Sequence, residues 1–294
     1  MSNKYYQENQ PTFGKKNANT MKKTFKKLFE NQTKFLTDPV AIKAWLDKYE
    51  VENYKINPDG TVECEIFAIF EKGLKEIPVK LSKARSIDIT GNEIKRIDFA
   101  PPIVEGDFDC WGNMIETLEG GPEKIMGSFD CDSNQLTDLS GGPKFVGGSY
   151  VCSGNPITSL KGVADHVGKY FKAVNCKLKE LDFFPTFIGT NIYIKSNEIT
   201  SFKGIQKKLK SFGTVAGENG KSGIIILTGN PIKEGLISVL GIRGLKELVY
   251  TEPKNTDAKR VFEAIKILNK IIVEGKDIFD AQDAFIEAGL KDLS

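Results

Sequence analysis

Two short stretches of this chain contain side chains that could support catalysis or nucleotide binding. His166 is the only histidine among the 294 residues, and a histidine-dependent triad needs a nucleophile that the surrounding pattern does not supply. Residues 217–222 (GENGKS) can be compared with a phosphate-binding loop, but Val215 stands where the first glycine of that motif belongs. This stretch leads into the strand-like residues 224–227 and not into a helix, whose N-terminus would bind the phosphate. We therefore expect no catalytic site, no cofactor and no small-molecule substrate.

The five cysteines are the other reactive side chains. Their number is odd, and no two of them form the C-x-x-C pair that favours zinc. Cys110, Cys131 and Cys152 are 21 residues apart in a column that we expect to face inward, and Cys64 lies in the first strand region. We interpret them as free buried thiols in a reducing cytoplasm, with disulfides or a metal site as the alternative.

A ladder of polar residues with a spacing of 21 is the strongest pattern in the sequence. Each member is followed two positions later by isoleucine or leucine, and apolar residues also stand five and three positions before it. A buried asparagine can donate to and accept from backbone groups that turn inward where a strand ends, and a small cysteine can occupy the same position. The ladder consists of Asn92, Asn113, Asn134, Asn155, Cys176 and Asn197, and Asn230 restores it after a longer interval.

This ladder matches the L-x-L-x-x-N/C-x-L pattern of a leucine-rich repeat, whose units each contain one short strand and a return arc and stack into a solenoid. The expected fold class is an α/β repeat, a leucine-rich-repeat-like solenoid with a parallel sheet on its concave face. A degenerate first copy, with Lys72 in the asparagine position, brings the expected number of turns to eight. Glycines before the strands, at positions 106, 127, 148, 168 and 189, are expected to permit sharp backbone turns.

Patterns outside the repeat divide the chain further. Asp38 and Pro39 predict the start of a helix, residues 57–60 (NPDG) predict a hairpin turn, and residues 257–272 and 280–290 predict two amphipathic helices. Terminal elements of this kind would cover the open ends of a solenoid. We expect a disordered basic segment (1–37), a helix-hairpin cap (38–63), the leucine-rich-repeat solenoid (64–250, with an insertion at 206–223) and a C-terminal helical cap (251–294).

The N-terminal segment is distinctly basic. Residues 1–37 contain eight lysines and two glutamates, although the whole chain has a formal net charge of only +2. From Met21 onward, lysines alternate with Phe25, Leu28 and Phe29 in a short amphipathic pattern. We interpret this segment as a solvated tail or packing extension, with an address or docking peptide as the alternative. Met21 could also be an alternative start.

Strand geometry indicates which side chains could bind a partner. Positions six, four and two before each ladder residue should point outward, because side chains alternate along a strand. The resulting candidates are Asp88, Asp107, Asp109, Trp111, Asp130, Asp132, Tyr170, Lys172, Tyr193 and Lys195. Aromatic anchors surrounded by charged residues are usual in protein hot spots. The alternative is that these aspartates only keep the face of the sheet soluble. The acidic half argues against binding nucleic-acid phosphates.

Several motifs together are similar to leucine-rich-repeat proteins encoded by large tailed bacteriophages. They are the stretch DPVAIKAWLDKYEVENYKINPDGTVE before GLKEIPVKL, the FDCxxNxLTxLxGGPxxVGGSY cycles and the tail IFDAQDAFIEAGL. The similarity covers roughly residues 38–290. It implies a phage-encoded binding solenoid made in an infected bacterium, and it implies no known activity. The insertion and residues 1–37 fall outside it.

Composition is typical of a soluble protein. The chain is 40% hydrophobic and 27% charged, contains no apolar stretch of the roughly 20 residues that a membrane span needs, and lacks the apolar centre of a secretory signal. We expect a monomeric protein-binding solenoid that acts on a host protein or complex in the bacterial cytoplasm. The alternative is a structural or packaged virion protein, since Leu28-Phe29-Glu30 resembles the hydrophobic-x-Glu cleavage sites of phage head maturation proteases.

Overall fold

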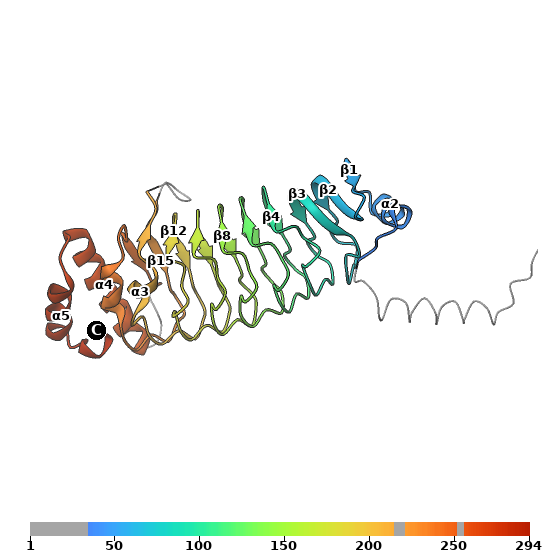
Figure 1. Cartoon of the computed structure of the whole chain (residues 1–294). Coiled ribbons are helices and arrows are strands. Elements are labelled where there is room, and N and C mark those ends of the chain that lie inside the picture. The colour runs from blue at the N-terminus through green and yellow to red at the C-terminus, as the bar shows by residue number, and fades with distance from the viewer. Residues whose placement is uncertain (1–34, 215–220, 252–255) are drawn as a thin grey trace, which may run out of the picture.

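The protein is a solenoid of about nine turns with a parallel sheet and a repeat of about 21 residues. This computed structural model describes residues 35–214, 221–251 and 256–294. The turns are stacked along one axis, with strands along one side of the stack and return arcs along the other (Figure 1). Our predictions for residues 1–34 and 215–220 lie outside the described residues.

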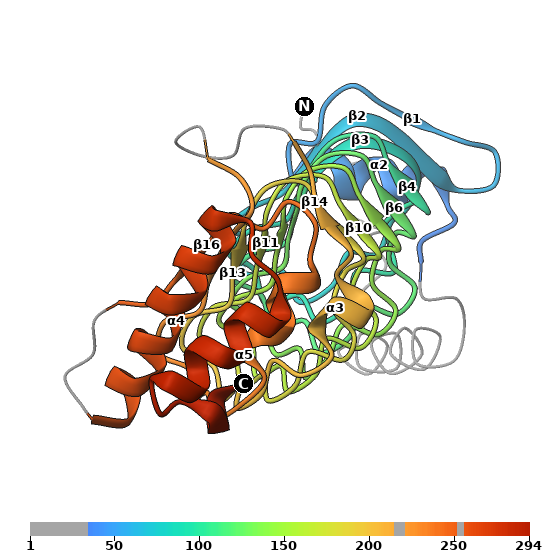
Figure 2. The ribbon, with the colours of Figure 1, turned by 90° about the vertical axis from the view of Figure 1, so that its left-hand side faces the viewer.

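In the described part of the chain, sixteen strands form a single sheet. The strands are β1 (Tyr54–Ile56), β2 (Thr61–Ala68), β3 (Lys80–Asp88), β4 (Ile103–Val104), β5 (Phe108–Asp109), β6 (Lys124–Ile125), β7 (Phe129–Asp130), β8 (Phe145–Val146), β9 (Tyr150–Val151), β10 (His166–Val167), β11 (Phe171–Lys172), β12 (Phe187–Ile188), β13 (Ile192–Tyr193), β14 (Ser211–Phe212), β15 (Ile224–Ile226) and β16 (Glu247–Val249). The helices are α2 (Pro39–Lys48), α3 (Ile205–Lys208), α4 (Thr256–Glu274) and α5 (Ile278–Glu287), with 3-10 helices η2 (Leu236–Gly241) and η3 (Lys291–Leu293). Seen along the stack, the turns overlap behind α4 and α5 (Figure 2).

Most turns contain two short strands, so the expectation of one strand per turn is wrong. The long strand β3 pairs with β4 and, further along, with β5. From there two rows of parallel strands continue side by side. Where the two rows separate, a side chain of the preceding turn accepts a backbone N–H. Ser128 N–H donates to Asp107 Oδ1 at 2.6 Å, and Ser149 N–H donates to Ser128 Oγ at 3.2 Å. The residues six positions before each ladder asparagine therefore complete the backbone hydrogen bonding where the two strands of a turn separate.

The ninth turn comes from β16, which has no ladder asparagine in the sequence. This strand pairs in parallel with β15, and Ile225 lies opposite Leu248. On its other side, Asn269 of α4 accepts from Leu248 N–H at 2.8 Å and donates to Leu248 O at 2.9 Å. A helix side chain thus satisfies the backbone groups that a further strand would otherwise pair.

The asparagine ladder connects neighbouring turns through buried hydrogen bonds. Asn134 accepts the N–H of Ile115, 19 residues earlier, and donates to the carbonyls of Cys110 and Cys131. The other asparagines repeat this arrangement, but Cys176 donates its thiol over longer distances, to Cys152 O at 3.5 Å and to Val174 O at 3.7 Å. The residue before each ladder position has a left-handed backbone, with φ between 54° and 81°: Gly91, Gly112, Ser133, Gly154, Asn175, Ser196 and Gly229.

Apolar side chains fill the inside of the stack. The residues five and three positions before each ladder residue are buried in all six regular turns, as the strand alternation predicts. A continuous row of aromatic rings contacts from turn to turn at centroid distances between 5.2 and 6.4 Å, and it comprises Phe67, Phe99, Phe108, Phe129, Tyr150, Phe171 and Phe184. Each buried ring contributes on the order of 1.5–3 kcal/mol.

The extra residues after Asn197 enter the turn at two places. The offset between paired residues is 24 where Ile188 lies opposite Phe212, and it reaches 33 where Ile192 lies opposite Ile225. The helix α3 lies before the first of these pairs, and residues 215–220 lie before the second. The single insertion predicted at 206–223 is therefore divided around β14, which keeps its regular place beside β12.

Both ends of the stack carry the elements that the sequence predicts. The Asp38 side chain accepts the N–H groups of Val40 and Ala41 at the start of α2, and β1 and β2 form the expected antiparallel hairpin. At the other end, α4 contacts β16, η2 and α5. Among the described residues, none of the helices is both long and apolar enough to span a membrane.

Candidate partner-binding face

The predicted outward positions form continuous rows on one face of the sheet, which we call the outer face. Strand register puts Asp88 opposite Asp109 and Asp109 opposite Asp130. The same row continues through Val151, Lys172 and Tyr193. Neighbouring strands lie about 4.8 Å apart. The row is thus acidic in its first turns and basic or aromatic in the later turns.

The aspartates of this row also have a structural role that the sequence pattern did not reveal. In each case, Oδ1 accepts the backbone N–H two residues later. Asp88 accepts from Thr90 at 3.0 Å, Asp109 from Trp111 at 3.0 Å and Asp130 from Asp132 at 2.9 Å. Because one carboxylate oxygen is held by the backbone, these side chains have a fixed orientation on the outer face.

Five carboxylates make up what we call the acidic patch. Its members are Asp88, Asp107, Asp109, Asp130 and Asp132. Several lysine-carboxylate pairs join the return arcs, for example Lys95 with Glu116 at 3.1 Å. Within the described residues, however, none of the five patch aspartates forms an ion pair. The patch therefore carries an excess of negative charge, which Lys172 offsets in part at Asp130 and Asp132.

Two apolar side chains that the sequence analysis missed lie beside the acidic patch. In the row of Trp111, backbone hydrogen bonds place Phe70 next to Thr90 and Thr90 next to Trp111. Phe70 is 53% exposed, Trp111 45% and Ile66 61%. Ile66 in β2 lies opposite Ser86 in β3, at the same end of the sheet. We call Ile66, Phe70 and Trp111 the apolar cluster. The first two were missed because their turn lacks a ladder asparagine, although counting back from Lys72 gives their outward position.

Burial changes the acidity of two patch carboxylates. The pKa of Asp130 is raised to about 6, first because the carboxyl is partly buried and then because Asp109 and Asp132 lie nearby. The hydrogen bond from Asp132 N–H and the charge of Lys172 oppose this rise. The pKa of Asp132 is also raised by burial. Crowded, partly desolvated carboxylates would gain from a cation that covers them.

We predict that Asp130→Asn stabilises the protein above pH 6 and has no effect below about pH 4. The folded state holds the Asp130 proton more tightly than the unfolded chain, whose aspartate pKa is about 3.9. The stability from this carboxyl is therefore complete below about pH 4 and is lost as the pH rises through 6. Asparagine stays neutral and keeps the oxygen that accepts Asp132 N–H. Thermal melts at pH 3.5 and 7.5 measure the difference.

Asp59→Asn provides a comparison with the opposite sign. The Asp59 carboxylate accepts from the N–H and the hydroxyl of Thr61 at 2.9 and 2.7 Å, and these bonds lower its pKa. Its stabilising contribution is present above the unfolded pKa and is lost on acidification. Asp59→Asn should therefore lower the melting temperature at pH 7.5. Equal melting curves for wild type and Asp130→Asn at pH 7.5 would contradict the raised pKa.

The later half of the predicted set forms a separate group. The rings of Tyr170 and Tyr193 contact edge to face at a centroid distance of 5.7 Å, and Lys172 and Lys195 belong to the same two turns. The turn of Tyr170 is three repeats beyond that of Trp111, so roughly 14 Å separates them along the stack. The structure thus brings the ten candidates together as two groups of opposite charge on one face.

His166 lies outside the outer-face rows, in a stack of aromatic rings. It is held between Phe145 and Phe187, with centroid distances of 4.8 and 4.6 Å and nearly parallel rings. Partial burial lowers the pKa of this histidine. Lys124 Nζ lies 4.9 Å from the Phe145 ring centroid. Packing between two rings gives the histidine a structural role.

The cysteines lie inside the stack, and all five are free. The thiols of Cys110 and Cys131 donate to the carbonyls of Asp130 and Val151 at 3.2 and 3.3 Å. Burial raises the pKa of both thiols well above the usual value. Their thiolates are therefore disfavoured, which makes them poor nucleophiles. No group of three or more metal-binding side chains in the described part of the chain could hold a metal ion.

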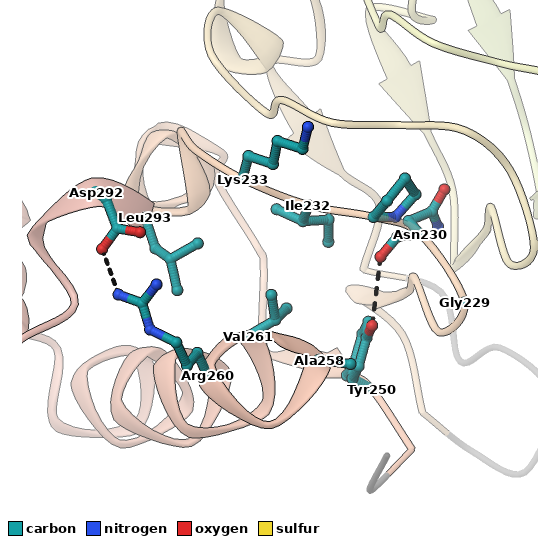
Figure 3. A pocket seen from close by; sticks show the side chains of 11 residues that line it. Gly229, Asn230, Ile232, Lys233, Tyr250, Ala258, Arg260, Val261, Asp292 and Leu293 are labelled. Carbon is teal, nitrogen blue, oxygen red and sulfur yellow. Dashed lines mark hydrogen bonds and ion pairs between the residues drawn. The ribbon is translucent and has the colours of Figure 1, made fainter. Parts of the chain in front are cut away.

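A cavity of about 870 Å³ lies between the last turns and α4 (Figure 3). Two polar interactions join residues that line the cavity. Arg260 pairs with Asp292 at 2.6 Å, and Tyr250 OH donates to Asn230 O at 3.3 Å. Apolar side chains line much of the remaining wall: Ile232, Val261 and Leu293. Because its arginine is already neutralised and no catalytic pair converges there, we place no site in this cavity.

Comparisons with family models and with curated proteins return no match to this chain.

Proposed function

We propose that the chain is a non-enzymatic protein-binding solenoid of the leucine-rich-repeat type, whose outer face binds a basic protein surface. The observation that carries this proposal is the acidic patch, whose five carboxylates lack ion-pair partners in the described part of the chain beside exposed Phe70 and Trp111. Exposed apolar groups framed by one sign of charge favour a complementary protein partner.

The leucine-rich-repeat identity is supported by the asparagine ladder. Each amide joins its own turn to the preceding one, which is the role that the L-x-L-x-x-N/C-x-L pattern requires. In this proposal the sheet forms the concave face, as in other repeats of this type. The helix α2 with the β1–β2 hairpin, and the helices α4 and α5, act as caps that keep the open ends from associating.

The partner that best fits this face is a lysine- or arginine-rich segment with one or two apolar side chains. Its cations would neutralise Asp109, Asp130 and Asp132, and its apolar groups would cover the apolar cluster. Pairing the crowded carboxylates would also lower the pKa of Asp130. Binding should therefore weaken at high salt, because the attraction is largely between exposed charges.

We predict that the triple variant Trp111→Ala, Asp109→Asn, Asp130→Asn loses partner capture and keeps its fold. Asparagine retains the oxygen that accepts the backbone N–H, whereas lysine would remove it. Affinity capture from infected cells, followed by mass spectrometry, should show at least a tenfold loss of the specific partner, which corresponds to about 1.4 kcal/mol. Circular dichroism and thermal melting verify the fold.

The matched control is Met114→Ala, Glu116→Gln, Glu119→Gln on the return-arc side, which removes one exposed apolar side chain and two carboxylates. This control should capture the partner normally. If the outer-face variant binds normally and the control does not, the binding surface is on the return arcs. Stoichiometric presence of the protein in purified phage particles, with no captured host protein, would favour the packaged virion role.

A further inference from the structure

We infer that the chain's own basic segment, residues 21–34, binds the acidic patch and must be displaced by an external partner. This inference rests on the proposed function, because it assigns a competitor to the same face. The segment carries Lys22, Lys23, Lys26, Lys27 and Lys34 against one glutamate, Glu30. It lies outside the described residues, and its composition and point of attachment carry the argument.

The charges and apolar groups of the two surfaces are complementary. The segment has a net charge of +4, and the acidic patch contributes five carboxylates without ion-pair partners in the described part of the chain. The segment also offers Phe25, Leu28 and Phe29, which match the exposed Phe70 and Trp111. Aromatic side chains at the centre of a charged contact commonly supply most of its binding energy.

The point where the chain enters the solenoid allows this contact. Leu36 N–H donates to Pro78 O at 2.7 Å, and the Phe35 ring centroid lies 5.7 Å from Lys80 Nζ. Lys80 begins β3 and Asp88 ends it, so the patch starts roughly 26 Å from this anchor. Residues 22–27 lie 8 to 13 positions before Phe35 and can reach roughly 26–45 Å when extended. The lysines therefore reach the patch without unfolding any described element.

Tethering makes even a weak contact effective. A short flexible link gives the attached segment an effective concentration in the millimolar range. A segment whose intrinsic dissociation constant is about 0.1 mM would then occupy the patch most of the time and weaken external binding by about tenfold. An external partner would need greater charge or apolar complementarity to displace it, and this requirement would give the face selectivity.

The two tryptophans allow a direct test in the full-length protein. Labelling with 5-fluorotryptophan gives one fluorine resonance for Trp111 and one for Trp45, and Trp111→Phe identifies the first. Trp45 packs against Tyr49 and Phe67 and provides the internal reference. The test variant is Lys22→Glu, Lys26→Glu, Lys27→Glu. The matched control carries the same charge reversal at Lys4, Lys15 and Lys16.

We expect the test variant to move the Trp111 resonance and at least double its solvent isotope shift between H2O and D2O. The Trp45 resonance and the charge-reversed control should match the wild type. A synthetic peptide of residues 21–36, added to the test variant, should restore the wild-type Trp111 resonance. Identical Trp111 resonances in wild type and test variant would overturn the inference. A resonance that changes with protein concentration would also overturn it, by showing that the segment binds a second copy.

Capture of an external partner distinguishes this inference from the proposed function. If the outer-face triple variant loses capture while Trp111 shows no shielding by the segment, the proposed function stands and the self-binding is wrong. If Trp111 is shielded but no basic partner is captured by either the wild type or the test variant, the self-binding stands and the proposed function fails. With both correct, the test variant should capture its partner about tenfold more tightly than the wild type.

Discussion

Replacing Asn134 with alanine is expected to lower the free energy of unfolding by about 3–5 kcal/mol. The side chain is only 2% exposed and makes four hydrogen bonds. Its oxygen accepts Ile115 N–H at 2.9 Å, and its nitrogen donates to the carbonyls of Cys110, Cys131 and Asp132 at 3.0–3.1 Å. Each lost bond costs about 0.5–1.5 kcal/mol, and the orphaned buried N–H adds about 1–3 kcal/mol.

The shared acceptors keep this estimate from being larger. Asn113 also donates to Cys110 O, and Asn155 also donates to Cys131 O, so both carbonyls retain a partner in the variant. The Ile115 N–H loses the acceptor that Asn134 supplies. Urea denaturation measures the change in unfolding free energy. A loss below about 1 kcal/mol would contradict the bridging role of the amide.

Cys176→Ala is the matched comparison within the same ladder. The thiol donates weakly at 3.5 and 3.7 Å and has no amide oxygen to accept a backbone N–H in the way that Asn134 does. Removing it should therefore cost less than about 1.5 kcal/mol. A similar loss at positions 134 and 176 would indicate that lost packing, and not hydrogen bonding, determines the stability of the ladder.

The repeat could be predicted from the sequence because every turn imposes the same physical demand at the same spacing. Asn134 and Asn155 satisfy equivalent backbone groups, so selection of one residue type at an interval of 21 follows from stacking. The ninth turn could not be recognised in this way. Its final strand is completed by Asn269 on α4, which is 21 residues from Leu248 in sequence but belongs to a helix.

The candidate site could be predicted only in part for a related reason. Alternation along a strand predicts that Asp109 and Asp130 share one row, and the strand register pairs them, because that pattern is local. The bond from Trp111 N–H to Asp109 depends on side-chain conformation, which spacing alone does not reveal. Phe70 belongs to a turn with a degenerate repeat, so its neighbour relation to Trp111 required the backbone pairing through Thr90.

This double use of the aspartates bears on how the face could evolve. Asp130 holds a backbone N–H and also carries charge that partial burial makes costly above pH 6. Asparagine would fill the structural role without the charge. At Asp130, backbone hydrogen bonding alone therefore does not require the negative charge.

Gly168 is required for a different physical reason from the one that we expected. We expected the glycines before the strands to permit sharp turns, but Gly168 does not have a left-handed backbone. A side chain is excluded there by the neighbouring turn. A Cβ on Gly168 would overlap the carbonyl oxygen of Gly147 and lie 2.7 Å from its carbonyl carbon, and a Cβ on Gly189 would likewise overlap Gly168 O.

Gly168→Ala is accordingly expected to destabilise the protein by at least about 3 kcal/mol. The methyl group meets rigid backbone, so two turns must move apart and weaken the bond from Gly168 N–H to Val146 O, now 2.9 Å. Gly241→Ala is the control, because its Cβ would meet only the Gln206 side chain at 3.2 Å, and its effect should stay within about 0.5 kcal/mol. Urea denaturation of both variants measures the difference. Equal stability of the two would show that the turns at Gly168 are less closely packed than this contact requires.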